Sequence, residues 1–253
     1  MSPETAPEIA AESKPMGEFS RLQGVFFEPG RTFADIAQRP RWIVPLLIGI
    51  LFSLGYIYAF SQHIGWEPYM HRLMDNNQRM LQLPPEQRQR IFDMQLKFVS
   101  ISSLASVAVF VPLILVIWAG IALGIVKGLM GVPIRFKQAF AALCYAGLPR
   151  AIYSVLSIAV VFLTKTPETF DVQNAFFSNP GALMDPLTSS KFLYTLASSL
   201  DIFVIWTVLL AATGLKAAGG KRLSFGGALF AVLLPGVCWV LLRGALAAAG
   251  LMG

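Results

Sequence analysis

The chain has 253 residues, of which 55% are hydrophobic and only 13% are charged. That charge content is about half of what a soluble domain carries, and the mean hydropathy is +0.62. These values exclude a water-soluble globular domain and predict an integral membrane protein. The net charge of +6 does not indicate nucleic-acid binding, because the basic residues are scattered between apolar segments, as is usual for Lys and Arg beside membrane spans.

The N-terminal region is the most polar part of the chain. Residues 1–16 are acidic and rich in Pro, Ala, Ser and Glu, a composition that predicts a disordered tail. Residues 17–41 carry apolar side chains at helical spacing and four arginines, with a break at Pro29 and Gly30. We expect this amphipathic juxtamembrane segment either to lie along the lipid headgroups or to pack against the end of the helix bundle.

Five apolar stretches are long enough to cross a bilayer as helices, which takes roughly 20 residues. The first is WIVPLLIGILFSLGYIYAF, residues 42–60, which has no charge and has aromatic residues at both ends, as expected at membrane interfaces. The others run over about residues 101–126, 139–163, 192–215 and 225–247. The sequence therefore predicts an all-α fold with a five-span membrane domain over residues 42–249.

A long polar excursion separates the first two spans. Pro68 suits the first turn of one helix and Pro85 the first turn of another, so residues 62–98 predict a helical hairpin whose second helix runs into span two. One face of the hairpin is rich in Met, a residue that adapts to varied partners. Internal packing is the favoured explanation of this face, with a docking surface as the alternative.

The connecting loops predict the topology. Residues 127–137 and 216–224 each carry three basic residues and no acidic one, which places both loops in the cytoplasm. With five spans, the N-terminus is then cytoplasmic, and the hairpin and the C-terminus are extracytoplasmic.

Span two contains glycines at every fourth position: Gly120, Gly124 and Gly128. Such spacing leaves one helix face as bare backbone that a second helix can approach closely. Packing within the bundle is the favoured use, and a seam between two copies leaves a homo-oligomer open.

Two charges fall inside the predicted spans. Arg150 and Asp201 each lie about ten residues from the start of spans three and four, on opposite sides, which corresponds to a depth of roughly 15 Å. Because an isolated charge costs at least about 2.5–3.5 kcal/mol there, one hypothesis is a buried ion pair. The alternative, which we favour slightly, is that the spans begin later, at Pro149 and Ser198, and leave both charges at interfaces.

Catalytic and metal-binding motifs are not found in the sequence. His63, Glu67 and His71 are spaced four apart, as metal ligands on one helix face would be. Gly65 and Pro68 interrupt that helix, so interfacial polar residues are the favoured explanation. We predict no catalytic residue, no cofactor and no metal, and a chain that is not an enzyme.

Four stretches in chain order resemble the Yip1-domain family, in its prokaryotic branch. The first contains Pro29, Thr32, Phe33, Ile36 and Pro40, with Pro45 opening span one; the second runs from Phe136 through Tyr145 to Pro149; the third runs from Leu200-Asp201 to Gly214-Leu215; the fourth is Leu223-Ser224-Phe225-Gly226. The resemblance implies five transmembrane helices and a cytoplasmic N-terminus. Eukaryotic members are linked to Rab GTPases and vesicle traffic, but their Asp-Leu-Tyr-Gly-Pro signature is missing before span one, which favours a bacterial plasma membrane.

These observations favour a non-catalytic membrane scaffold or adaptor, in membrane organisation or a trafficking-like process. The expected partners are membrane lipids and a protein that the sequence does not identify, and nucleic acid is not expected. The alternative is a small transporter or channel for a lipid or solute, in which Arg150 and Asp201 would mark a polar pathway.

Overall fold

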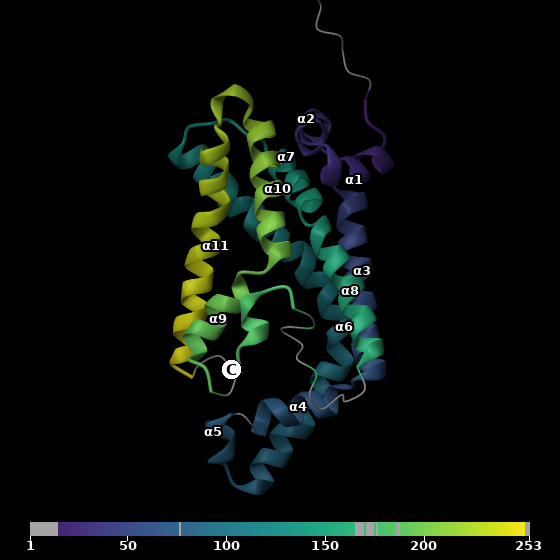
Figure 1. Ribbon diagram of the computed structural model, residues 1–253, viewed down its shortest axis with the longest axis vertical. Helices are drawn as coiled ribbons and strands as arrows, with labels where there is room; N and C mark the ends of the chain where they lie inside the picture. The colour runs from purple at the N-terminus through teal and green to yellow at the C-terminus, as the bar shows by residue number, and fades with distance from the viewer. Residues whose placement is uncertain are drawn as a thin grey trace, which may run out of the picture.

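A computed structural model describes residues 15–75, 77–164, 170, 175, 177–185 and 188–250. The described residues form helices and no strands, and they include five helices or helix pairs long and apolar enough to cross a membrane. The predicted all-α, five-span fold is therefore confirmed. Figure 1 shows an elongated bundle with α1 and α2 at one end, which we call the N-terminal end, and α4 and α5 at the other, which we call the hairpin end.

Two short helices form a layer across the N-terminal end. They are α1 (Glu18–Phe27) and α2 (Pro29–Gln38). Pro29 takes the first turn of α2, where its missing N–H costs nothing. The inner side of the layer buries Val25, Phe33 and Ile36 against α7 and α10, so the layer packs against the bundle end, one of the two placements that the sequence left open.

The first and second spans are joined by the helical hairpin. Helix α3 (Ile43–His63) ends before Gly65, whose φ of 85° suits glycine, and α4 (Trp66–Asp75) and α5 (Gln78–Leu81) follow. Helix α6 (Pro85–Gly124) then continues without a break into the second span. Its 40 residues extend for about 60 Å, twice the roughly 30 Å of the hydrocarbon core, so the helix protrudes from the membrane.

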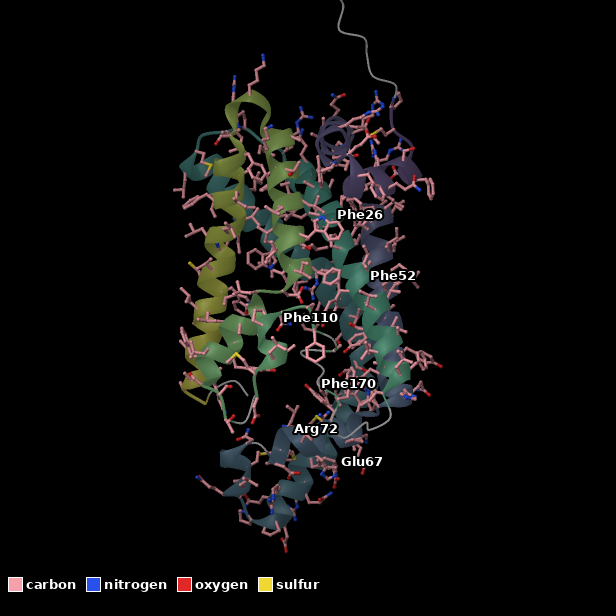
Figure 2. The ribbon with its side chains drawn as sticks, in the orientation of Figure 1. Phe26, Phe52, Glu67, Arg72, Phe110 and Phe170 are labelled. Atoms are coloured by element: carbon pink, nitrogen blue, oxygen red, sulfur yellow. The ribbon has the colours of Figure 1, made fainter. Side chains whose placement is uncertain are left out.

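The hairpin has a small core of its own, in which Met70 and Met74 of α4 pack on Phe92 of α6. These Met side chains are buried, so internal packing, the favoured explanation of the Met-rich face, accounts for them. Arg72 ties the hairpin to the rest of the chain by donating to the Phe170 carbonyl oxygen, 2.6 Å away. Figure 2 labels these two residues close together at the hairpin end.

The last three candidate spans complete the bundle. A π-helical turn (Ile125–Leu129) leads from α6 toward α7 (Phe136–Ala146) and α8 (Leu148–Leu163), which meet at Gly147. Helix α10 (Ile202–Gly219) returns to the N-terminal end, and a 3-10 turn (Gly220–Arg222) connects it to α11 (Phe225–Ala248). These helices expose many large apolar side chains on the surface of the bundle, as a lipid-facing surface requires.

The fourth span differs from its predicted range of 192–215. Residues Lys191–Ser199 form a separate helix, α9, after a 3-10 turn at Pro180–Leu183, and α10 begins only at Ile202. The break falls at Leu200 and Asp201, because Asp201 takes an extended backbone conformation and caps the new helix with its own carboxylate.

Candidate functional site

A buried ion pair holds the two N-terminal helices together. Arg21 of α1 has a side chain only 2% exposed, and its Nη2 and Nε lie 2.6 and 2.7 Å from Oδ2 of Asp35 in α2. A buried guanidinium needs such a partner, because an unpaired buried charge is very costly. Gly24 permits the close approach of the helices, since a Cβ there would lie 2.3 Å from the hydroxyl oxygen of Thr32.

The same network reaches the membrane bundle through Tyr145 of α7. The Tyr145 hydroxyl donates to Oε2 of Glu18 at 2.6 Å, and Glu18 also lies 3.5 Å from Arg21 and 3.4 Å from Arg41. Tyr145 itself is fully buried. We call Glu18, Arg21, Asp35 and Tyr145 the N-terminal clamp, because together they join α1, α2 and α7.

The electrostatics of the clamp keep Arg21 charged. Burial alone lowers the pKa of its guanidinium, but the neighbouring Asp35 and Tyr145 outweigh burial, so the pKa is raised above its ordinary value. The Arg21 guanidinium of the clamp therefore stays charged near neutral pH.

The family-like residues of α2 form the apolar part of the same junction. Thr32, Phe33 and Ile36 are buried, and the Phe33 ring lies where a Cβ on Gly214 of α10 would come within 3.0 Å. Gln138 at the start of α7 donates to the carbonyl oxygen of Ala37 at 2.8 Å. Pro45 and Pro149 are buried near the starts of α3 and α8, whereas Pro29 and Pro40 lie partly exposed at the ends of α2.

Contacts between the spans fix the depth of the two intramembrane charges. Gly55 faces Ile158, and Nε2 of His63 donates to the carbonyl oxygen of Thr164, so α3 and α8 run side by side in one direction. This register puts Arg150 about one and a half turns inside the starting level of α3. In the antiparallel α10, Phe203 packs on Tyr153, with ring centroids 5.7 Å apart. Asp201 is thus level with the middle of α3.

The carboxylate of Asp201 serves local backbone structure. Its Oδ1 accepts from the backbone N–H groups of Phe203 and Val204, at 2.8 and 3.2 Å, and its Oδ2 accepts from the Ser178 hydroxyl. The carboxylate is therefore the N-cap of α10. Since Ser178 also accepts the Ile202 N–H through its carbonyl oxygen at 3.0 Å, the irregular segment around Ser178 is attached to the start of α10.

Arg150 lies on the exposed side of α8, and its guanidinium carbon is 6.0 Å from the centre of the Tyr153 ring. The ion pairs found among the described residues do not join it to Asp201. The two residues are connected indirectly, because Tyr153 lies between them and contacts Phe203. Direct pairing, one of the two hypotheses from the sequence, stays a prediction, and the difference in depth between the two residues explains why this geometry lacks it.

The glycines of span two face outward. A Cβ added at Gly120, Gly124 or Gly128 would meet nothing within 4 Å, so the favoured use of these residues, close packing within the bundle, is not what this structure shows. The reason is angular. The buried face of α6 contains Ala119 and Ala122, and the glycines lie on the opposite, exposed side of the helix. A seam between two copies stays a prediction.

The histidine-containing triplet is split between two helices. His63 ends α3 and approaches the carbonyl oxygen of Thr164 at 3.2 Å, while His71 and Glu67 lie 4.0 Å apart on α4. His71 packs on Phe92, with ring centroids 4.2 Å apart. Within the described parts of the chain, no three His, Cys, Asp or Glu residues are placed to hold a metal.

Sequence reasoning missed three members of the clamp: Glu18, Arg21 and Asp35. A signal was present, because Glu18 and Arg21 are spaced three apart on a helix and Asp35 lies on the next one. Opposite charges in a juxtamembrane segment are easily taken for surface residues. Only the fold shows that Arg21 points inward.

The comparison with known families supports the resemblance found in the sequence. A family model of the Yip1 domain matches residues 24–242. The chain belongs to the Yip1 domain family. No curated protein and no solved structure matches it. Within the clamp, Asp35 and Tyr145 fall inside the Yip1 domain match, whereas Glu18 and Arg21 precede it.

Proposed function

We propose that this Yip1 domain protein is a non-catalytic membrane scaffold or adaptor whose docking platform is the α1–α2 layer. The observation that carries the proposal is the N-terminal clamp. A docking platform must hold a fixed orientation relative to the membrane, and the paired Arg21 with the hydroxyl contact from Tyr145 provides one. Membership of a membrane protein family agrees with this role.

The proposed topology follows from the basic loops. Residues 127–137 and 216–224 lie at the same end as α1 and α2 (Figure 1), and their basic residues favour the cytoplasm. The docking platform would then be cytoplasmic and the hairpin extracytoplasmic. The missing eukaryotic signature favours the plasma membrane of a bacterium.

Photo-crosslinking in native membranes tests the adaptor proposal. A benzophenone amino acid replaces Ala34, an exposed residue of α2, and in a control protein it replaces Leu51, a residue of α3 that is 65% exposed. The proposal predicts an adduct with the same second protein in every preparation at position 34 and only lipid adducts at position 51. Lipid alone, a second copy alone, or no adduct at position 34 would overturn it.

A transporter remains the second candidate because of the position of Asp201. Transporters place the N-termini of interrupted helices near the membrane midplane, beside irregular backbone, and α10 begins in this way beside Ser178. Native mass spectrometry in lipid nanodiscs tests this candidate. A retained solute that is lost in Asp201→Asn and kept in Lys191→Gln would support transport, and equal spectra for all three proteins would exclude it.

A further inference from the structure

Helix α6 carries one exposed apolar stripe along most of its length. Its large members nearest the hairpin recur at helical spacing and are Met94, Phe98, Ile101 and Val109, and Leu113 and Ile117 continue the exposed apolar surface farther round the helix. Within the second span this stripe faces outward, where lipid chains surround the protein. The same stripe continues beyond the span into the hairpin, where Met94 and Phe98 are 66% and 72% exposed.

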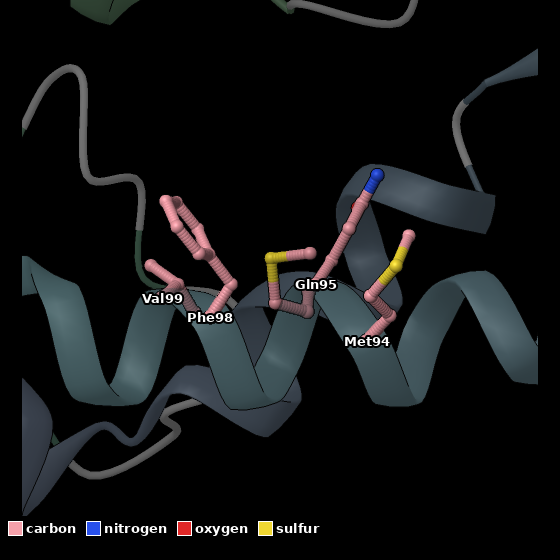
Figure 3. A pocket seen from close by; sticks show the side chains of 5 residues that line it. Met94, Gln95, Phe98 and Val99 are labelled. Atoms are coloured by element: carbon pink, nitrogen blue, oxygen red, sulfur yellow. The ribbon is translucent and has the colours of Figure 1, made fainter.

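The part of the stripe outside the span forms one side of a groove. Its lining is apolar except for Gln95, and consists of Met70 of α4 together with Met94, Gln95, Phe98 and Val99 of α6. Figure 3 shows the side chains of Phe98 and Met94 standing on the same side of α6. An adjoining hollow contains Lys97, Ile101 and Ser102 as well. The groove is therefore lined mainly by apolar side chains, and the Lys97 side chain lies at its edge.

The groove lies beside the end of the predicted second span, the level at which lipid headgroups are expected. Helix α4 begins after α3 has ended, and its Met70 packs around Phe92 of α6. The residues of α6 near Phe92 are thus beyond the end of the first span. Ile101 begins the predicted second span, and Lys97 precedes it by about one turn.

An exposed Phe and Met at this level need an apolar cover, since a large apolar side chain left in water loses the free energy of its burial. The continuous stripe identifies the cover. A lipid chain that already lies along Ile101 and Val109 can follow the same helix face as far as Met94 without leaving an apolar surface.

We propose that the groove binds one acyl chain of a phospholipid from the leaflet at the hairpin end, with the phosphate of that lipid beside Lys97. The charge of Lys97 favours an anionic headgroup. The bound lipid is drawn partly above the plane of its neighbours, so this Yip1 domain protein holds a lipid at the membrane surface independently of any partner on the α1–α2 layer.

Photo-crosslinking at Phe98 tests the occupant. A benzophenone amino acid replaces Phe98 in the full chain, in nanodiscs that contain phosphatidylethanolamine and phosphatidylglycerol. The matched control carries it at Gln87 on the same helix, about 16 Å farther from the membrane. We expect a phospholipid adduct at position 98 and none at position 87. An adduct with a second copy or another protein, or no lipid adduct at position 98, would overturn the proposal.

A charge reversal tests the headgroup. Lys97→Glu is compared with Arg90→Glu, which makes the same change two turns farther out on the same side of α6. Loss of one surface cation corresponds to about a fivefold fall in affinity for an anionic lipid. We expect phosphatidylglycerol retained in native mass spectra to fall by about that factor or more in Lys97→Glu only. Equal retention in both variants would overturn the role of Lys97.

Discussion

Single side chains at the N-terminal end join distant parts of the chain, which composition alone does not predict. The buried Tyr145 donates its hydroxyl to Glu18, a residue more than a hundred positions away, and so joins the α1–α2 layer to a membrane helix. Glu18 in turn contacts Arg21, whose charge is balanced by Asp35. A substitution of any one of these residues leaves a buried polar group without a partner. The effects of such substitutions on the free energy of unfolding should therefore not be additive.

Tyr145→Phe isolates the hydroxyl of the clamp. The ring stays in place, and the carboxylate of Glu18 loses one donor, so we expect unfolding to become easier by about 1.5–3 kcal/mol, the usual contribution of a hydrogen bond to a charged group. Tyr58→Phe is the matched control, because Tyr58 is 58% exposed, and its effect should stay within about 0.5 kcal/mol. Both are measured by reversible denaturation in mixed micelles. Equal effects of the two substitutions would show that the hydroxyl contact has no role in stability.

Two substitutions of Asp201 show whether its carboxylate acts as a helix cap or as a member of an ion pair. Asn caps a helix as well as Asp does, whereas Ala does not, so Asp201→Ala should lose about 0.5–2 kcal/mol and Asp201→Asn much less. If Asp201 instead pairs with Arg150, both substitutions strand the arginine and should be similarly harmful. The same denaturation assay compares them. Rescue of Asp201→Arg by a second change, Arg150→Asp, would establish direct pairing and contradict the cap as the main role.

At the scale of helices, glycines on different spans have opposite surroundings. Gly214 of α10 is in tight contact, since a Cβ there would lie 2.7 Å from the Cβ of Ala142 and 3.0 Å from the Phe33 ring. Gly124 of α6 has open space around it. The glycine pattern of span two does not mark a contact within this chain, because spacing alone does not specify which face of a helix is buried, and the seam between two copies stays a prediction.

Paired substitutions test this difference. Gly214→Ala should destabilise the protein by about 1–3 kcal/mol through overpacking, whereas Gly124→Ala should stabilise it by about 0.5–1 kcal/mol through the lower flexibility of the unfolded chain. Thermal unfolding of both variants at low protein concentration gives the two signs. If Gly124→Ala is destabilising, and the loss grows with protein concentration, the glycines form a seam between two copies.

At the scale of the whole molecule, hydropathy predicted the membrane class, the number of spans and the hairpin, because lipid imposes long uninterrupted apolar segments. It failed where one residue changes the path of the chain. The sequence left Asp201 either inside a span over residues 192–215 or, as slightly favoured, at an interface where a later span begins. In the structure its carboxylate caps α10, and α9 and α10 are separate helices. The clamp was missed for a related reason, since whether Arg21 is buried depends on the way that α1 lies on α7.

The proposed topology predicts which side of the membrane each end of the bundle faces. Single cysteines are introduced at Gln87 in the hairpin and at Lys221 in the loop before α11, after Cys144 and Cys238 are replaced. In intact cells a membrane-impermeant maleimide should label position 87, and it should label position 221 only after permeabilisation, because basic loops favour the cytoplasmic side. The reverse labelling pattern would contradict this topology. The α1–α2 layer would then lie outside the cell, and the proposed lipid groove of α6 would lie in the inner leaflet.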